Sequence, residues 1–256
     1  MCSSLKPKTF YLVQPKPTLM KKLLVLALLF SLANTACNYR RIKGSGNIIS
    51  EQRSIGNAHK IKLEGSYDVE LAPGQSASLK VEGDDNILPY IITQNEGGWL
   101  VIKSKGHINF STKNPLKVYI TTDMLEAISL SGSGNIVGTG RFAGAEKLEV
   151  KISGVGNAKL EVNAPYVSAN ISGSGSITLI GETKDAKINI SGIGSYKGID
   201  LKAENAEVRV SGSGSATVFA ENKLDVHVSG IGDVNYKGNA TVSQHVSGNG
   251  SVKKIQ

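Results

Sequence analysis

The stretch KINISGIGSYKG, residues 187–198, contains a motif that recurs throughout the second half of the chain. The motif is Ser-Gly-x-Gly, and its copies begin at Ser131, Ser153, Ser172, Ser191, Ser211, Ser229 and Ser247. Successive copies are 18 to 22 residues apart. A period of this length indicates stacked structural units, each of which buries its apolar side against its neighbours.

Each copy is preceded by a short segment in which apolar and polar residues alternate. The residue directly before the serine is always aliphatic: Leu130, Ile152, Ile171, Ile190, Val210, Val228 and Val246. The residue before that one is mostly polar, as at Lys151, Asn189 and Arg209. A period of two predicts a strand with one face inward. A second short strand follows each motif, as in NAKLEV at residues 157–162.

Glycine loses more conformational freedom on folding than any other residue. Its recurrence at fixed positions therefore indicates a backbone conformation or a close approach that other residues do not allow. A Gly-x-Gly corner can adopt positive φ, and it lets successive backbones approach closely. We therefore expect the motif glycines to be structural corners, with positive φ at both Gly212 and Gly214. The full set is Gly132, Gly134, Gly154, Gly156, Gly173, Gly175, Gly192, Gly194, Gly212, Gly214, Gly230, Gly232, Gly248 and Gly250.

These features predict an all-β fold, a right-handed parallel β-helix or solenoid of two main sheets that meet at the Ser-Gly-x-Gly corners. The variable residue of the motif alternates between polar and aliphatic: Ser133, Val155, Ser174, Ile193, Ser213, Ile231 and then Asn249. Because solenoids tend to stack like on like, the alternation favours two repeats, about 38 residues, in each coil. A coil of one repeat is the alternative.

The N-terminal sequence MKKLLVLALLFSLANTAC, residues 20–37, is typical of a bacterial signal peptide. Two lysines precede an apolar run of about eleven residues, shorter than the roughly 20 that span a bilayer. We expect translation to start at Met20 and a lipid to be attached to Cys37, which would place the protein in the cell envelope as an outer-membrane lipoprotein. A periplasmic or secreted protein without the lipid is the alternative.

The part between the signal peptide and the repeats is rich in predicted strands but not repetitive. HKIKLEGSYDVELAPG, residues 59–74, alternates across a Gly-Ser bend, and GDDN, residues 83–86, is a turn signal. GSGN, residues 44–47, resembles an isolated corner. The predicted organisation is a signal peptide (1–37), a linker (38–50), an N-terminal β-rich part (51–127) and the β-solenoid repeats (128–256).

More than half of the net positive charge of the chain lies before Cys37. The formal net charge is +8, yet five of the 29 basic residues and no acidic residue precede Cys37. The remainder has 24 basic against 21 acidic residues, a net charge of +3. This balance is too weak to indicate phosphate binding, so we expect no nucleic-acid partner. Two cysteines also exclude a disulfide scaffold or a Cys-rich zinc module.

Acids and histidines that could carry chemistry are few. Asp84 and Asp85 are adjacent in a turn, and Asp233 is the one corner acid that could bind calcium, so we expect solvated acids and no calcium. His227 and His245 occupy the same position of consecutive repeats, without a third repeated ligand, which favours solvated histidines over a metal site. Serines occur in every corner, so none is singled out as a nucleophile. We therefore expect no catalytic, metal-binding or cofactor-binding residue.

Aromatic residues are also scarce, and Trp99 is the one tryptophan. Sites for carbohydrate or single-stranded nucleic acid usually offer aromatic faces for stacking. Tyr196 and Tyr236 follow Ile-Gly corners two repeats apart. We favour the interpretation that they fill space at the corners, and the alternative is that they stack on each other along one edge.

Three features together resemble the family described as the putative autotransporter adhesin head, or GIN domain. They are the lipoprotein-like start, the strand pair KIKLEGSYDVEL followed by GDDNIL, and VYITTDMLEAISLSGSGNI, which opens the Ser-Gly-x-Gly array. The resemblance covers roughly residues 50–250. It implies a pectin-lyase-like β-helical fold and an adhesive role, with no established catalytic residues to carry over.

The sequence thus predicts a non-enzymatic protein of the cell envelope, acting in adhesion or as a surface or assembly scaffold. Its expected partners are the membrane, through the lipid anchor, and a protein or glycan at the cell surface. A polysaccharide-acting enzyme or a glycan-binding protein on a β-helix is the alternative. The identity of the ligand, the membrane face and the formation of homo-oligomers stay open.

Lipidation at Cys37 can be tested directly in the native host. We expect mass spectrometry of the mature N-terminus to show a cleaved chain that begins with a diacylglyceryl-modified Cys37. An unmodified start at Cys37 or Asn38 would instead identify a soluble secreted protein.

Overall fold

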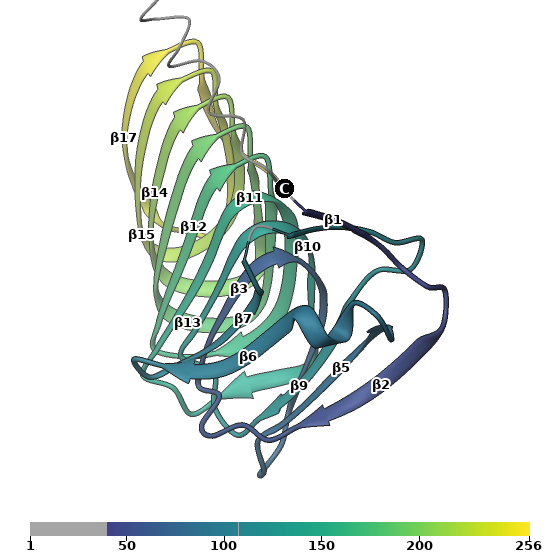
Figure 1. Cartoon of the computed structure of the whole chain (residues 1–256). Helices are drawn as coiled ribbons and strands as arrows, with labels where there is room; N and C mark the ends of the chain where they lie inside the picture. Colours follow the sequence, from purple (N-terminus) through teal and green to yellow (C-terminus); the bar gives the residue numbers. More distant parts are fainter. Residues whose placement is uncertain (1–39, 107) are drawn as a thin grey trace, which may run out of the picture. The chain divides into compact units, whose positions relative to one another are not determined.

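The computed structural model describes residues 40–106 and 108–256, and Figure 1 shows them as a stack of coils that continues into a β-rich part. The predicted signal peptide, the start at Met20 and the lipidation of Cys37 lie outside the described residues. Strands make up most of the described residues, which also contain one short 3-10 helix, η1 (Leu88–Tyr90). Within the described ranges, no helix is long and apolar enough to span a membrane. The strands are β1 (Arg40–Lys43), β2 (Ile48–Arg53), β3 (Lys60–Ser66), β4 (Asp68–Pro73), β5 (Ser78–Asp84), β6 (Ile91–Glu96), β7 (Trp99–Ser104), β8 (Ile108–Ser111), β9 (Lys117–Thr122), β10 (Ala127–Ala143), β11 (Lys147–Asn163), β12 (Tyr166–Gly173), β13 (Ser176–Gly192), β14 (Ser195–Gly212), β15 (Ser215–Gly230), β16 (Asp233–Lys237), β17 (Thr241–Gly248) and β18 (Ser251–Lys254).

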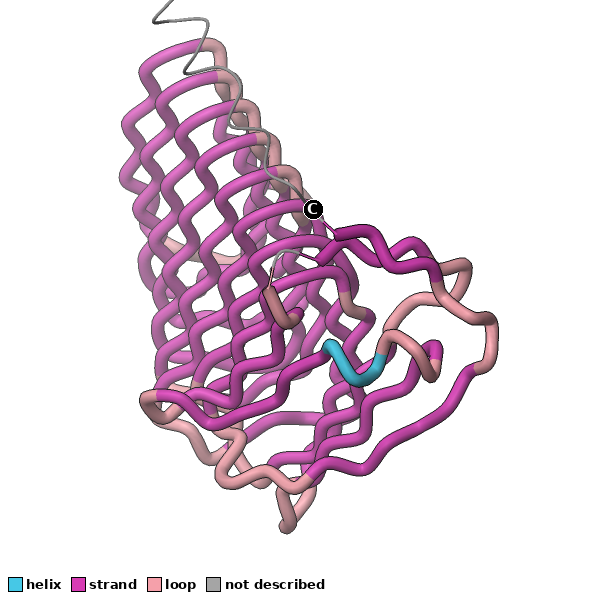
Figure 2. The backbone as a smooth tube through the Cα atoms, viewed as in Figure 1, coloured by secondary structure: helices cyan, strands magenta, loops and turns pink. Residues whose placement is uncertain are grey.

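The repeats form a parallel β-solenoid, so the predicted fold class is confirmed. Strands β10 to β15 pair in parallel with their successors, and β15 pairs in parallel with β16 and β17. Strands β10 and β11 run through the corner without interruption, whereas β13, β14 and β15 end at its first glycine, and the smooth tube of Figure 2 shows the strand segments stacked in successive coils. Each coil therefore has one strand segment before its corner and one after it.

One repeat forms one coil, and the favoured arrangement of two repeats per coil is wrong. The register pairs Ser191 with Ser211 and Gly192 with Gly212, which are equivalent positions of consecutive copies. Aliphatic and polar variable residues consequently alternate along one column of the stack. The column tolerates this because its aliphatic members point into solvent, with exposed fractions of 61% for Val155, 71% for Ile193 and 65% for Ile231. Packing therefore does not select like residues there.

The core follows the inner row that the alternation predicts. In β11, Val150 and Ile152 before the corner and Leu160 and Val162 after it are at most 1% exposed. Apolar residues at equivalent positions of the other coils join them in one cluster that extends from Ala58 to Val234. Burial of this continuous cluster supplies the main driving force for folding.

The two glycines of a corner are required for different reasons in every copy after the first, where Gly132 and Gly134 both have positive φ. Gly212 has φ of +133°, and a Cβ there would lie 2.6 Å from the carbonyl oxygen of Gly192. Gly214 does not have positive φ, so the expectation for this glycine is wrong. A Cβ on Gly214 would instead lie 2.5 Å from Cγ2 of Ile190 in the preceding coil. The first glycine thus satisfies a backbone conformation, and the second leaves room for the core.

The stack of coils begins before the sequence repeat does. Strand β3 pairs in parallel with β10, and Gly65, with φ of +145°, aligns with Gly132. Strand β7 extends the stack beyond β3, while β2, β5 and β9 form antiparallel pairs beside it. Residues 38–50, expected to be a linker, include β1 and the start of β2.

Tyr196 fills space in the core. Its side chain is 2% exposed, and a Cβ on Gly198 would collide with its ring. Tyr236 is partly buried and packs against the same core. Tyr196 aligns with Ala216, whereas Tyr236 aligns with Val218, so the two tyrosines do not share a column. The filling interpretation is therefore right, and stacking along one edge is excluded.

The corner geometry predicts the effect of adding a side chain. Gly212→Val should lower the free energy of unfolding by about 1–3 kcal/mol or more, because valine is strained at positive φ and meets backbone atoms. Arg209→Thr, on an exposed side chain of the same strand, should change it by less than about 0.5 kcal/mol. Denaturant unfolding measures both. Equal, small effects would show that the motif glycines are not structural corners.

The burial of Tyr196 predicts that its phenol loses its proton at a higher pH than an exposed tyrosine does. Desolvation raises the pKa of Tyr196, and burial raises that of Tyr67 as well. In the unfolded chain these two phenols lose their protons near pH 10, at lower pH than in the folded protein. The free energy of unfolding should therefore keep its full value below pH 10 and decrease as the pH rises above it. In an absorbance titration of the folded protein, Tyr196→Phe should remove one late-titrating phenol. An unchanged late amplitude would contradict this, and titration in guanidinium is the control.

Candidate functional site

The strand segments that precede the corners form one continuous outer surface, which we call the ladder face. It comprises β7, β3, β10, β11, β12, β13, β14, β15 and β17, which are hydrogen-bonded in that order. Because every other residue of a strand faces outward, equivalent outward residues of successive coils align in columns across the strands.

Three columns cover most of the ladder face. The column nearest the corner is a row of serines that belong to the motif. The central column is Lys62, Ser129, Lys151, Asn170, Asn189, Arg209, His227 and His245. The outer column is Lys60, Ala127, Glu149, Ser168, Lys187, Glu207, Asp225 and Ser243. The ladder face is therefore polar, and it combines uncharged hydrogen-bonding groups with charges of both signs.

Contacts between neighbouring coils, and one within a strand, hold these side chains in place. The amide nitrogen of Asn189 donates to Oδ1 of Asn170 at 2.9 Å. Glu207 forms ion pairs with Lys187 at 3.2 Å and with Arg209 at 2.6 Å. Such restraint lowers the entropy that the side chains would lose when a ligand binds.

Four hollows lie on the ladder face or at its margin. One of about 340 Å³ lies over β13, β14, β15 and β17, between the central column and the serines, with Arg209, His227 and His245 in its lining. A second of about 460 Å³ lies farther from the corner, between Tyr166 and Asp225. Two more, of about 410 and 460 Å³, both have Trp99 in their lining. The surface thus offers a series of shallow sites.

The structure brings His227 and His245 together. Their ring centroids are 6.2 Å apart, and Nε2 of His227 lies 3.3 Å from Oδ1 of Asp225. The His227 side chain is about half exposed, as expected for a solvated histidine. Within the part of the chain that the structure describes, no group of three or more His, Cys, Asp or Glu side chains is placed to hold a metal ion.

The predicted solvation of the turn acids is wrong for Asp84. Its side chain is 1% exposed, and its carboxylate accepts from the backbone N–H of Gly46 at 2.6 Å and from the hydroxyl of Thr112. Asp85 stays partly exposed and accepts from Ser45 and Asn47, which lowers its pKa. GSGN therefore folds against GDDN as a closed loop, a long-range contact that the turn residues alone do not reveal.

Asp233 remains an exposed acid at its corner. The hydroxyl of Ser251 in the following coil donates to Oδ1 of Asp233 at 2.5 Å. The contact places a hydroxyl beside the acid, so Asp233 continues the polar column of the second strand segment.

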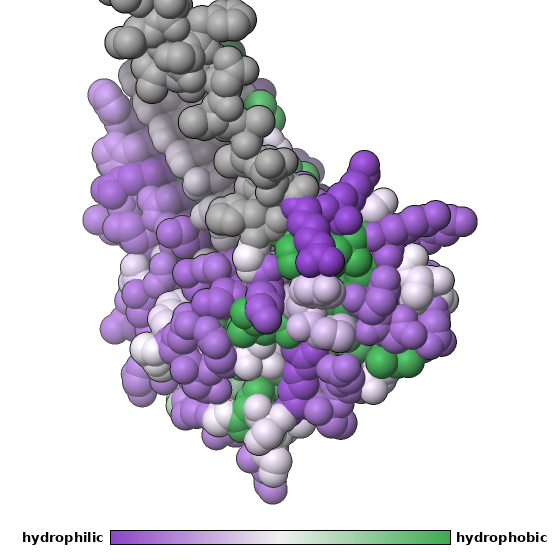
Figure 3. Space-filling view, viewed as in Figure 1, coloured by the Kyte–Doolittle hydropathy of each residue, from purple (hydrophilic) through white to green (hydrophobic). Residues whose placement is uncertain are grey.

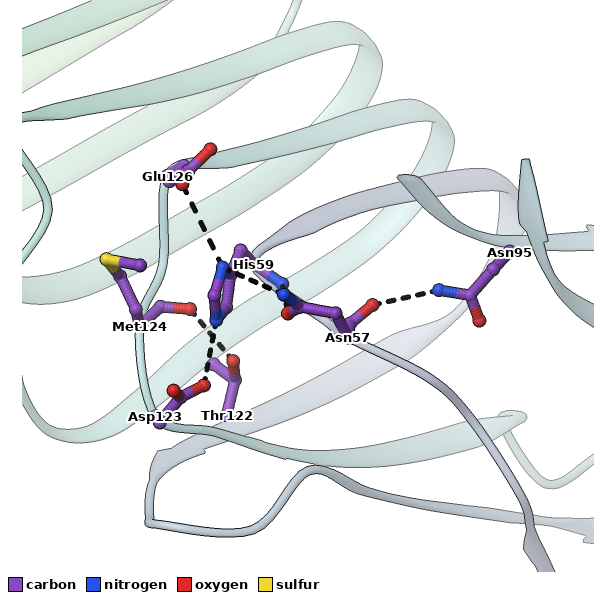
Figure 4. A network of polar contacts seen from close by, with 7 residues as sticks. All are labelled: Asn57, His59, Asn95, Thr122, Asp123, Met124 and Glu126. Carbon is purple, nitrogen blue, oxygen red and sulfur yellow. Dashed lines mark hydrogen bonds and ion pairs between the residues drawn. The ribbon is translucent and has the colours of Figure 1, made fainter. Parts of the chain in front are cut away.

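A histidine that the sequence did not single out, His59, lies in the network of Figure 4. The backbone N–H of His59 donates to Oδ1 of Asn57, which turns the Asn57 amide nitrogen toward Nδ1 at 3.2 Å. Nε2 lies 2.9 Å from Oδ1 of Asp123, and this hydrogen bond lowers the pKa of Asp123. Both ring nitrogens therefore have a hydrogen-bond partner. The network joins the start of β3 to the turn that precedes β10.

Known structures with the same fold include proteins described as adhesins. A putative adhesin from Bacteroides fragilis has a TM-score of 0.79 and 24% identity, over 84% of this chain and 100% of its own. A putative lipid binding protein from Parabacteroides distasonis has a TM-score of 0.71 and 27% identity, over 85% and 100%. A putative adhesin from the same species has a TM-score of 0.67 and 25% identity, over 84% and 100%. None of the curated proteins matches this chain.

The family assignment rests on the sequence and agrees with the fold. A family model described as "Putative auto-transporter adhesin, head GIN domain" matches residues 57–240. This match covers the first coil on β3, Trp99 and all but the last coil of the ladder face. The chain therefore belongs to the family of adhesin-like GIN head domains.

Proposed function

We propose that the protein is a non-enzymatic adhesin of the cell envelope, which binds its target through the ladder face and is held at the membrane by a lipid on Cys37. The observation that carries this proposal is the wide ladder face itself. Nine strands about 4.8 Å apart span about 38 Å, and a seven-residue segment spans about 23 Å. The resulting area of roughly 870 Å² is similar to the roughly 800 Å² that each partner buries in a standard protein interface.

The contacts of the titratable groups support binding over catalysis. A general base needs a ring nitrogen or a carboxylate oxygen within reach of a substrate proton. Both nitrogens of His59 are engaged by Asn57 and Asp123, and the Asp84 carboxylate is buried beneath the Gly46 loop. The four hollows are shallow and are distributed along the stack, as suits a ligand that is gripped at several points.

The polar composition of the surface also suits a protein exposed to water until it meets its target. In the space-filling view, hydrophilic residues cover most of the visible face and apolar residues form small separate patches (Figure 3). Adhesion through such a surface depends on hydrogen bonds and ion pairs distributed over many coils. We therefore expect binding to respond to substitutions in the ladder face.

The proposal can be tested with two variants matched in charge. Lys187→Ala with Arg209→Ala removes two cations from the ladder face, whereas Lys159→Ala with Lys197→Ala removes two from the segments after the corner. Binding of the labelled protein to immobilised mucin, fibronectin, collagen and whole host bacteria is measured. We expect the wild type to bind at least one surface, the ladder variant to bind at least fivefold less, and the control to bind normally.

Two results would contradict the proposal. The first is equal binding by both variants, or no binding to any surface. The second is turnover of acidic or neutral polysaccharides by the purified protein that is abolished by one point substitution, which would instead support the enzyme alternative.

A further inference from the structure

We propose that Trp99 and the two hollows beside it form a binding site for a neutral saccharide, an inference that rests on the adhesive function proposed above. Trp99 is the first residue of β7. Leu100 pairs with Ile61, so Trp99 lies beside Lys60 at the start of the ladder face. The side chain is partly buried and borders both hollows. Their volumes, about 410 and 460 Å³, are within the range of small-molecule sites.

The Trp99 ring differs from three other partly exposed rings of the protein, Tyr119, Tyr166 and Phe219. At these three rings a lysine ammonium lies over the aromatic face: Lys80 over Tyr119 at 3.9 Å, Lys147 over Tyr166 at 5.6 Å and Lys202 over Phe219 at 4.0 Å. Among residues 40–106 and 108–256, no such cation lies over Trp99. An indole face bordered by open volume can stack on the apolar face of a sugar ring.

Small residues make the space beside Trp99. Ala127 of β10 lies in the outer column, where the neighbouring strands carry Lys60 and Glu149. Gly144 and Ala145, in the turn before β11, line the same hollow. A ring that stacks on Trp99 would therefore lie over a floor of small side chains, within reach of longer polar side chains on both sides.

The polar lining is balanced in charge. The hollow of about 410 Å³ has Lys62 and Lys151 together with Glu96 and Glu149. In the other hollow, Lys60 pairs with Glu126 at 3.3 Å. A hydroxyl group both donates and accepts hydrogen bonds, so adjacent carboxylates and ammonium groups can bind a vicinal diol from two sides. A polyanion would instead meet the carboxylates, which favours a neutral saccharide.

The site has a built-in probe, because Trp99 is the sole tryptophan of the chain. The purified protein is titrated with maltotetraose, cellotetraose, mannotriose and the N-acetylglucosamine trimer while tryptophan emission is recorded. We expect at least one of them to cause a saturable shift of the emission to shorter wavelength, since stacking removes water from the indole. A heparin oligosaccharide and phosphatidylcholine vesicles should cause none.

Variants locate the site, with calorimetry as the readout. Trp99→Ala should bind the active saccharide at least about tenfold more weakly, a loss of about 1.4 kcal/mol. Phe219→Ala, which removes a partly buried ring from the segment after a corner, should bind normally. Glu149→Gln keeps the shape but not the charge, and should weaken binding about threefold. Circular dichroism checks folding, and Trp99→Phe should bind with intermediate affinity.

Three results would overturn this site: no saccharide shifts the emission, the vesicles or heparin shift it instead, or Trp99→Ala binds as tightly as the wild type. The adhesive function would survive each of them if the variant of Lys187 and Arg209 still loses surface binding. Loss of saccharide binding and loss of adhesion are therefore distinguishable.

Discussion

Backbone contact between the corner glycines is the constraint on which the rest of the structure depends. The carbonyl of Gly173 accepts from the N–H of Ile193 at 2.9 Å, and that of Gly192 accepts from Ser213 at the same distance. A carbonyl so close to the next glycine leaves no room for a Cβ. Each coil can therefore dock on its neighbour in one register, and this register aligns the core residues on the inside and the columns of the ladder face on the outside.

The two ends of the stack are finished differently. At the β3 end, β7 and its antiparallel partner β6 continue the sheet, and β2, β5 and β9 pack beside it. At the β17 end, the inner position aligned with Val226 is occupied by Gln244, and Val246 is 37% exposed. A polar residue in the last inner row reduces the apolar surface that the final coil leaves open, as edge strands commonly require.

The sequence was sufficient for features that repeat and insufficient for features that occur once. The strand before each corner and its inner row, such as Ile190 and Val210, follow from alternation alone. The number of repeats per coil could not be inferred from Ile193 and Ser213, because exposed residues do not constrain stacking. Contacts that occur once could not be predicted from sequence patterns, because they join residues far apart in the chain. Burial of Asp84 beneath the Gly46 loop depends on a contact between residues 38 positions apart.

The one-repeat coil has a consequence for how such a protein can change its reach. Adding or removing a coil would move the ends by one strand spacing, about 4.8 Å, while the neighbouring coils keep the same backbone contacts. Adding or removing one coil would, however, shift the alternation of Val155, Ile193 and Ile231 with the intervening serines by one position in all the coils beyond it. Length can thus vary in fine steps, but the edge pattern is preserved only when coils are gained or lost in pairs.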